Sequence, residues 1–285
     1  MRKTNFYEVA GHVFGVEAED YIFEYADNYS FFLIEEKSSP LFKLEVKSEK
    51  FLQCYQEELS QEEEGQKIIC GHTNDGKSVY EFILGGIKTG VLVCGENFVE
   101  NVLYINKGYE KFSLDNALMI IFALASASKS TLLFHSSTIE KDGKGYMFLG
   151  KSGTGKSTHS RLWLKNIPQT ELLNDDNPAV RIFNGNTVKV FGTPWSGKTP
   201  CYKNKSCELR SIVVLKQAPY NKITPLSGIF AYAAVVPGVS GKRWVKTIAD
   251  SLHETENSLI QLVKVFQLEC LPDDEASVLC YNTIK

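Results

Sequence analysis

The chain has 285 residues, of which 43% are hydrophobic and 23% are charged, as in a globular protein with one large or two smaller domains. The formal net charge is −3 and the 31 Lys and Arg residues are scattered, which argues against a basic surface for nucleic acid or an acidic membrane. The seven cysteines include no C-x-x-C pair, so neither a disulfide framework nor a zinc site is indicated, and a reducing cytoplasm fits best.

The N-terminal part, residues 6–106, contains short runs of β-favouring residues that are separated by turn residues. Such runs occur at 31–34, 41–46, 79–84 and 91–94. The acidic, Gln-rich segment 56–66 is expected to form a solvated helix or loop. The first residues lack the apolar stretch of a signal peptide. We therefore predict a β-rich, mostly antiparallel N-terminal domain over residues 1–112.

The next segment predicts a buried helix that ends near Ala127, with Ser113 as its N-cap and Asp115 in its first turn. Its longest apolar run, 117–125, is too short to cross a bilayer, so we expect a soluble cytoplasmic protein without a membrane partner. Strands then alternate with helices, which indicates an α/β (mixed α+β) domain over residues 113–285.

The predicted elements of this second domain follow in order. They are strands over 131–140 and 145–149, a helix over 156–166, a short strand at 172–173, a hairpin of 179–183 with 188–191, an interior strand over 211–215, a helix over 241–263, and terminal strands at 265–268 and 278–279. If the hairpin turns at Gly185-Asn186, paired residue numbers sum to 371. That register returns Pro194-Trp195 beside Asp176 and Asn177.

The segment Gly150–Ser157 matches the pattern G-x-x-x-x-G-K-[ST] at every specified position. Glycines let backbone N–H groups turn toward phosphate oxygens, Lys156 supplies a positive charge, and Ser157 offers a hydroxyl to magnesium. A strand leads into the segment and a helix follows it, which argues against a chance glycine-rich turn. We predict binding of ATP with Mg²⁺. The expected nucleotide-binding residues are Gly150, Ser152, Gly153, Thr154, Gly155, Lys156, Ser157 and Thr158.

A hairpin precedes this loop, because Asp142-Gly143 is a typical two-residue turn. Paired residue numbers then sum to 285, which places His135 opposite Gly150 at the mouth of the phosphate site. His135 either positions an acid near the transferred phosphate or is a structural histidine at a strand end. His159, on the helix after the loop, is expected to be a surface or packing residue.

Asp175 and Asp176 follow the short strand and can divide the tasks of holding magnesium and accepting a hydroxyl proton. The alternative is an acidic turn before Pro178. The loop 192–198 is a candidate wall of the site, with Trp195 packing there and Lys198 available to an anionic substrate, although a plain surface loop fits equally well.

The combination resembles the HPr kinase/phosphorylase-like group of P-loop kinases, which is related in its nucleotide-binding fold to phosphoenolpyruvate carboxykinase. The resemblance spans about residues 115–220 and rests on Leu133–Ser136 with its histidine, the hairpin into Gly150–Thr158, and Asn174–Asp176. It implies that Lys156 contacts the β and γ phosphates and that Ser157 and Asp176 hold the metal. It also implies that Asp175 acts as the base toward a substrate hydroxyl and that His135 supports this aspartate.

Two features depart from this group. The segment before Ser211 reads Gly-Thr-Pro-Trp-Ser-Gly and lacks the arginine-bearing motif that those enzymes use in dephosphorylation, which argues against a reverse phosphorylase activity but leaves the question open. The β-rich N-terminal domain also differs from that of those enzymes. A related kinase is therefore the expected function.

The expected reaction is transfer of the γ-phosphoryl group of ATP to a hydroxyl of a protein, a peptide or a small metabolite. A carboxykinase would need further Arg and Lys contacts for a dicarboxylate, and a nucleotide-sensing module would not need both acids. Assembly as a homo-oligomer is left open, although enzymes of this group often form hexamers.

Overall fold

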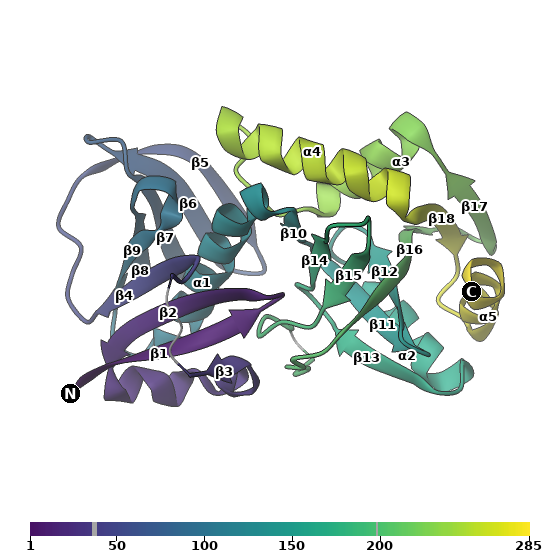
Figure 1. The fold of residues 1–285 in the computed structure, drawn as a ribbon, viewed down its shortest axis with the longest axis horizontal. Coiled ribbons are helices and arrows are strands. Elements are labelled where there is room, and N and C mark those ends of the chain that lie inside the picture. Colours follow the sequence, from purple (N-terminus) through teal and green to yellow (C-terminus); the bar gives the residue numbers. More distant parts are fainter. Residues whose placement is uncertain (36–38, 198) are drawn as a thin grey trace. The chain divides into compact units, whose positions relative to one another are not determined.

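The computed structural model describes residues 1–35, 39–197 and 199–285, which form two compact units, Met1–Ala125 and Ser126–Lys285. Each unit is built on its own sheet, and the described residues show nine strands in each of the two (Figure 1). The protein is therefore of the mixed α/β class, as predicted. The boundary between the units lies at the end of helix α1 (Glu110–Ser126), whereas the sequence predicts it before this helix.

The sheet of the first unit has the strand order β3-β1-β2-β4-β9-β8-β7-β6-β5. Neighbouring strands are antiparallel except for β2 with β4 and β4 with β9, which are parallel. The bounds are β1 (Arg2–Val9), β2 (His12–Glu19), β3 (Leu33–Ile34), β4 (Phe42–Lys47), β5 (Tyr55–Glu63), β6 (Gln66–Thr73), β7 (Ser78–Leu84), β8 (Ile87–Cys94) and β9 (Glu100–Ile105).

The acidic segment 56–66 forms most of strand β5 and the turn into β6, so the prediction of a helix or loop is wrong. Strand β5 lies at the edge of the sheet, and nearly all of its residues are exposed. A strand is recognised in a sequence by its alternation of apolar and polar residues. Because both faces of β5 are in solvent, this strand has no such alternation. The turn is made by Glu64 and Gly65, both with positive φ.

Helix α1 packs closely against this sheet, because a Cβ added to Gly90 on β8 would lie 2.9 Å from the Ser113 hydroxyl oxygen. Ser113 is fully buried inside the helix, and the helix begins at Glu110, so the predicted N-cap is wrong. With the turn that follows it, this helix (Glu110–Lys129) has the length and composition of a membrane span, but 61% of its most apolar window is buried in the protein. That is the pattern of a core helix.

The sheet of the second unit has the order β10-β14-β15-β16-β12-β11-β13, with β18 beside β16 and β17 beside β18. Strand β12 runs parallel to β16, and β16 runs parallel to β18. The strands are β10 (Thr131–Leu133), β11 (Ser136–Lys141), β12 (Lys144–Leu149), β13 (Thr170–Asn174), β14 (Ala179–Ile182), β15 (Val188–Phe191), β16 (Ser206–Gln217), β17 (Lys222–Leu226) and β18 (Lys264–Cys270). The helices are α2 (Lys156–Asn166), α3 (Gly228–Val235), α4 (Lys246–Leu262) and α5 (Asp274–Ile284).

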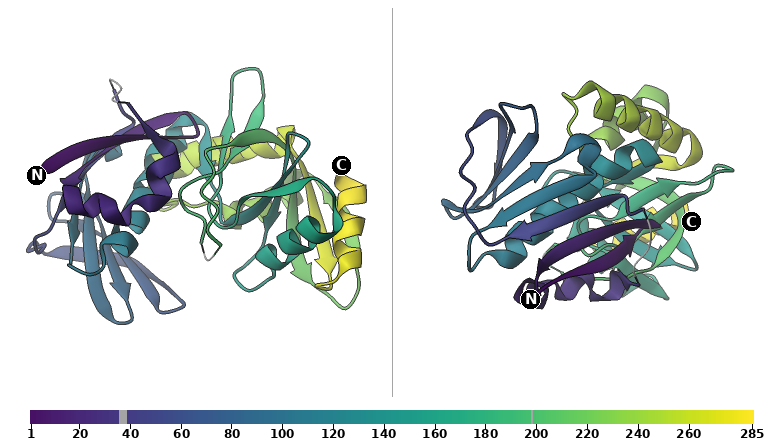
Figure 2. Two further views of the ribbon diagram at one scale, coloured as in Figure 1. Left: turned by 90° about the horizontal axis from the view of Figure 1, so that it is seen from below. Right: turned by 60° about the vertical axis from the view of Figure 1, so that its left-hand side comes forward.

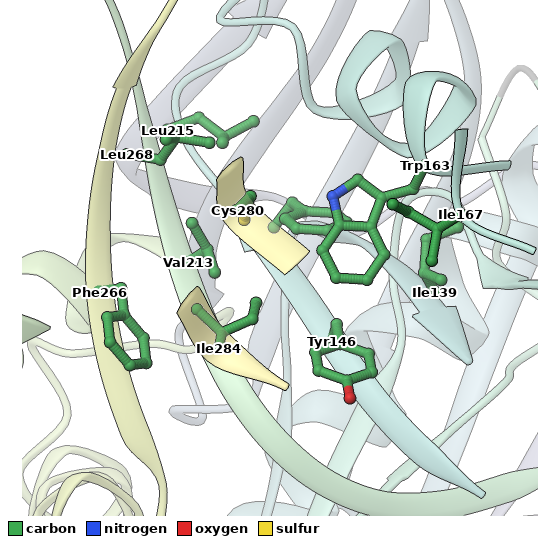
Figure 3. Packing of buried hydrophobic residues seen from close by; sticks show 11 residues of the cluster. Ile139, Tyr146, Trp163, Ile167, Val213, Leu215, Phe266, Leu268, Cys280 and Ile284 are labelled. Atoms are coloured by element: carbon green, nitrogen blue, oxygen red, sulfur yellow. The ribbon is translucent and has the colours of Figure 1, made fainter. Parts of the chain in front are cut away.

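Helices α2 and α5 cover one face of this sheet (Figure 2), where they enclose a cluster of buried apolar residues. Trp163 of α2 is fully buried in the cluster, near Tyr146 of β12 (Figure 3). The Trp163 ring lies 5.1 Å from that of Tyr146 and 5.3 Å from that of Phe148, which is also on β12. Cys280 and Ile284 of α5 complete the packing. Helix α2 is thereby fixed against strand β12, and the glycine-rich loop of residues 150–155 joins the two.

Two predicted details of the second unit are wrong. Residues 278–279 lie in α5, whose N-cap Asp273 accepts a hydrogen bond from the backbone N–H of Ala276 at 2.9 Å. In the hairpin of β14 and β15, paired residue numbers sum to 370, as in Val180 with Val190. The turn contains Asn184 as well as the two predicted residues, and this additional residue shifts the register by one position.

His159 is a packing residue, one of the two roles predicted for it. It is 3% exposed, its ring lies edge-on to Phe148 at 4.7 Å, and its Nε2 accepts a hydrogen bond from the Trp163 indole N–H at 3.1 Å. This contact needs an unprotonated Nε2, and burial lowers the pKa of His159 from 6.5 to about 4.

We expect the free energy of unfolding to fall as the pH decreases from about 6.5 to about 4, because in this range the unfolded chain binds a proton at His159 and the folded chain does not. From the two pKa values, the loss at pH 5 is about 2 kcal/mol. Denaturant unfolding at pH 7.5 and pH 5 measures it, and His159→Gln, which does not titrate there, should show a smaller loss. Equal losses in both proteins would show that His159 does not cause this dependence.

Candidate functional site

The glycine-rich loop of residues 150–155 connects the end of β12 to the start of α2, at the carboxyl end of the parallel pair β12 and β16. Gly153 and Gly155 have φ values of 75° and 107°, a region that other residues rarely adopt. Gly150 is tightly packed, since an added Cβ would lie 3.1 Å from the Thr154 side chain. The glycines of the pattern are therefore needed by the backbone of this loop.

Lys156 opens α2 and is only 9% exposed. Its Nζ donates a hydrogen bond to the carbonyl oxygen of Gly150 at 3.0 Å, so the ammonium group lies across the loop. From the end of β16, Gln217 Nε2 donates to the carbonyl oxygen of Gly153 at 3.3 Å. This position of Lys156 places a positive charge inside the curve of the loop.

The hairpin of β11 and β12 has the predicted register, in which paired residue numbers sum to 285, from Ser136 with Leu149 to Lys141 with Lys144. The predicted long strand is interrupted before Ser136, because β10 pairs with β14 whereas β11 pairs with β12 and β13. His135 lies at this interruption, and its backbone N–H donates to the carbonyl oxygen of Gly238 at 2.7 Å. His135 directly precedes Ser136, and Gly150 directly follows Leu149, the residue with which Ser136 pairs. His135 therefore lies just beyond the last pair of the hairpin, at the end where the loop begins.

The His135 imidazole contacts Asp176, with Nε2 3.4 Å from Oδ1. The other oxygen of Asp176 accepts a hydrogen bond from Asn177 Nδ2 at 2.8 Å. Gly197 packs on the same side chain, because a Cβ added there would lie 2.9 Å from Asp176 Cβ. The resemblance implied that His135 supports Asp175, whereas the contact in the structure is with Asp176.

Asp175 has hydroxyl groups as partners. Ser137 on β11 donates a hydrogen bond to Asp175 Oδ1 at 2.6 Å, and the Ser137 and Ser160 hydroxyl oxygens are 2.6 Å apart. Ser160 lies on α2, one turn after Lys156. Sequence reasoning missed both serines. Spacing could have indicated them, since Ser137 lies two residues after His135 in the predicted strand 131–140 and Ser160 lies four residues after Lys156 on the predicted helix.

Asn174 holds the turn that carries both acids. It is fully buried, its Oδ1 accepts from the backbone N–H of Asp176 at 2.9 Å, and its Nδ2 donates to Thr193 Oγ1 at 3.1 Å. The backbone N–H of Asn177 donates to the carbonyl oxygen of Trp195 at 3.1 Å, so the predicted return of this loop to the acids is present. Trp195 is 5% exposed. Lys198, the predicted contact for an anionic substrate, lies outside the described residues.

The donors of the site suit magnesium. Within residues 1–35, 39–197 and 199–285, no group of three or more His, Cys, Asp and Glu side chains is placed to hold a metal ion. Mg²⁺ is usually bound by one or two carboxylates together with phosphate oxygens and water. A serine hydroxyl such as that of Ser157 is also an oxygen ligand that magnesium accepts. By residue type, Ser157 and one of the two aspartates therefore fit a magnesium ion that binds together with a nucleotide.

Comparison with known proteins places the chain in a family. The sequence model described as "SynChlorMet cassette protein ScmC" matches residues 103–270, more than half of the chain. No curated protein shows significant similarity to it. Among solved structures, the HPr(Ser) kinase/phosphatase from Coxiella burnetii is similar with a TM-score of 0.30 and 13% identity, covering 53% of this chain and 91% of that chain. The chain therefore belongs to the ScmC family.

Proposed function

We propose that this protein is a kinase that binds ATP with Mg²⁺ and transfers the γ-phosphoryl group to a hydroxyl group of an acceptor. The observation that carries this proposal is that the structure links the loop with Lys156 to the aspartates that follow β13. A glycine-rich loop leads into α2, which opens with Lys156, and two aspartates directly follow β13. One of them, Asp175, is tied to α2 through the hydrogen-bonded pair Ser137 and Ser160. Phosphoryl transfer needs such an arrangement, in which positive charges hold the phosphates and a carboxylate accepts the proton of the acceptor hydroxyl.

The nucleotide would bind along Gly150–Thr158, with backbone N–H groups toward the phosphate oxygens. Lys156 would leave the Gly150 carbonyl and bind the β and γ phosphates, because a charged phosphate oxygen is a stronger acceptor than a carbonyl group. The Ser157 hydroxyl would bind the magnesium ion, which supplies positive charge to the phosphates.

The partners of the two acids favour different roles for them. Asp176 is in contact with an imidazole, and a carboxylate paired with histidine suits proton transfer from a substrate hydroxyl. Asp175 is bound through serine hydroxyls to α2, the helix that also carries Ser157, which suits a second ligand of the metal. We therefore propose Asp176 with His135 as the base and Asp175 with Ser157 as the metal ligands, the reverse of the roles that the resemblance implied.

The acceptor is proposed to be a serine or threonine of a protein or peptide, with a small hydroxylated metabolite as the second choice. This choice follows from the resemblance of the loop, the hairpin and the acids to protein kinases of the HPr type.

The test is incubation of the protein with γ-labelled ATP and an extract of its source organism. We expect label in an acid-stable phosphoester, with slow release of free phosphate when the extract is omitted, since water is a poor substitute for a positioned acceptor. Label found only as free phosphate, at a rate that the extract does not change, would contradict the proposal and favour an ATPase or a nucleotide sensor. Formation of phosphoenolpyruvate from added oxaloacetate would instead establish a carboxykinase.

A further inference from the structure

Three side chains from separate elements form a chain of hydrogen bonds that ends at Asp175. Ser137 has one hydroxyl hydrogen, which it donates to Asp175 Oδ1 at 2.6 Å. The contact of 2.6 Å between Ser137 and Ser160 must therefore be donated by Ser160. The order is thus Ser160 to Ser137 to Asp175, from α2 through β11 to the end of β13.

Both serines are enclosed by the protein, since Ser137 is fully buried and Ser160 is 1% exposed. A hydroxyl group that donates to a carboxylate at this distance makes a strong, charge-assisted hydrogen bond. Because the two serines are packed in the interior, they fix Oδ1 of Asp175 with respect to α2. The second oxygen of Asp175 receives no hydrogen bond from either serine.

Metal-binding carboxylates typically have partners of this kind, which orient the ligand and are needed for full metal affinity. We infer that Ser137 and Ser160 are positioning residues that hold Asp175 as a magnesium ligand beside Ser157. This inference rests on the proposed function for the role of Asp175. The serines would touch neither the nucleotide nor the acceptor, and would act only through the orientation of Asp175.

A neighbouring residue provides a matched control. Thr138, next to Ser137 on the same strand, is also fully buried, and its hydroxyl has no hydrogen-bond partner in the part of the chain that the structure describes. Thr138→Val therefore removes a buried hydroxyl of the same strand without removing a partner of an acid. Ser137→Thr keeps the hydroxyl at the tested position.

The experiment measures ATP binding by calorimetry at a series of Mg²⁺ concentrations, and separately the rate of transfer at saturating Mg²⁺. We expect Ser137→Ala to raise the Mg²⁺ concentration for half-maximal ATP binding about tenfold or more, the usual effect of losing such a partner. Ser137→Thr should remain near the wild type, and Thr138→Val should have no effect. The double variant of Ser137→Ala with Ser160→Ala should resemble Ser137→Ala alone, because Ser160 acts through Ser137.

An unchanged Mg²⁺ requirement in Ser137→Ala, checked to be folded by its unfolding midpoint, would overturn the inference. A lower transfer rate at saturating Mg²⁺ with an unchanged Mg²⁺ requirement would also overturn it, since Asp175 would then act in the chemical step. The binding measurement does not depend on transfer. If the wild type binds ATP with Mg²⁺ but never phosphorylates an acceptor, the kinase proposal fails while the role of Ser137 is still decided.

Discussion

Replacement of Asp176 by asparagine is expected to lower the rate of phosphoryl transfer about a thousandfold and to leave the affinity for ATP within about twofold of the wild-type value. A positioned base contributes roughly 10²–10⁴-fold to such a step, and it acts in the transition state more than in the bound ground state. Asparagine has nearly the same shape and can keep a contact with His135, which lies 3.4 Å from the present carboxylate. Steady-state kinetics with the acceptor and calorimetry with ATP measure the two quantities.

The matching variant is Asp175→Asn, which should mainly raise the Mg²⁺ requirement and recover part of its activity at high Mg²⁺. His135→Asn should lower the rate less than Asp176→Asn, and the two changes combined should cost little more than Asp176→Asn alone, because both act on one base. The opposite result is informative. If Asp175→Asn abolishes transfer at saturating Mg²⁺ and Asp176→Asn raises the Mg²⁺ requirement, the roles that the sequence resemblance implied are correct.

Replacement of Lys156 by methionine is expected to weaken ATP binding about a hundredfold. A hydrogen bond to a charged group contributes about 1.5–3 kcal/mol, and Lys156 would make such bonds to phosphate oxygens. Methionine is preferable to alanine because Lys156 is only 9% exposed, so its apolar stem packs in the protein and needs a replacement of similar length. Calorimetric titration with ATP and Mg²⁺ measures the change in affinity.

Lys165→Met is the matched control, because Lys165 lies on the same helix and forms an exposed ion pair with Asp274 at 2.7 Å. Its replacement should leave the affinity for ATP unchanged. The unfolding midpoints of both variants should be measured, since Lys156 also donates to the Gly150 carbonyl in the absence of nucleotide. A folded Lys156→Met protein that binds ATP as tightly as the wild type would show that the loop does not hold the phosphates.

The sequence predicted the hairpin of the phosphate site well, because Asp142-Gly143 can only make a short turn and a short turn fixes the register. For the hairpin of β14 and β15, the predicted register was wrong by one residue, since Asn184-Gly185-Asn186 offers two positions for the turn. Both Gly185 and Asn186 adopt positive φ, so the residue types alone do not distinguish them. The prediction was thus accurate where the turn residues allowed one geometry.

The partner of His135 could not be predicted for a different reason. Asp175 and Asp176 are adjacent, so their side chains leave the backbone in different directions, and the structure places one beside Ser137 and the other beside His135. The strand is also interrupted before Ser136, where the backbone of His135 bonds to Gly238 and Phe134 bridges to Val239. These partners lie far along the chain, and no local pattern in the sequence indicates them.

The predicted C-terminal strand failed because Val278-Leu279 was considered without its neighbours. Asp273 precedes a run of acidic residues, and an acidic N-cap followed by Asp274 and Glu275 is a typical helix start. This indication was present in the sequence. By contrast, the exposed edge strand β5 had no apolar alternation from which it could be recognised.

The most direct test is a crystal structure of the protein with Mg²⁺ and a non-hydrolysable ATP analogue. We expect the β and γ phosphates within Gly150–Ser157, Lys156 Nζ moved from the Gly150 carbonyl to the phosphate oxygens, and the metal bound by the Ser157 hydroxyl and Asp175. A nucleotide bound outside this loop, or no bound nucleotide at saturating concentration, would contradict the proposal that this chain is an ATP-dependent kinase.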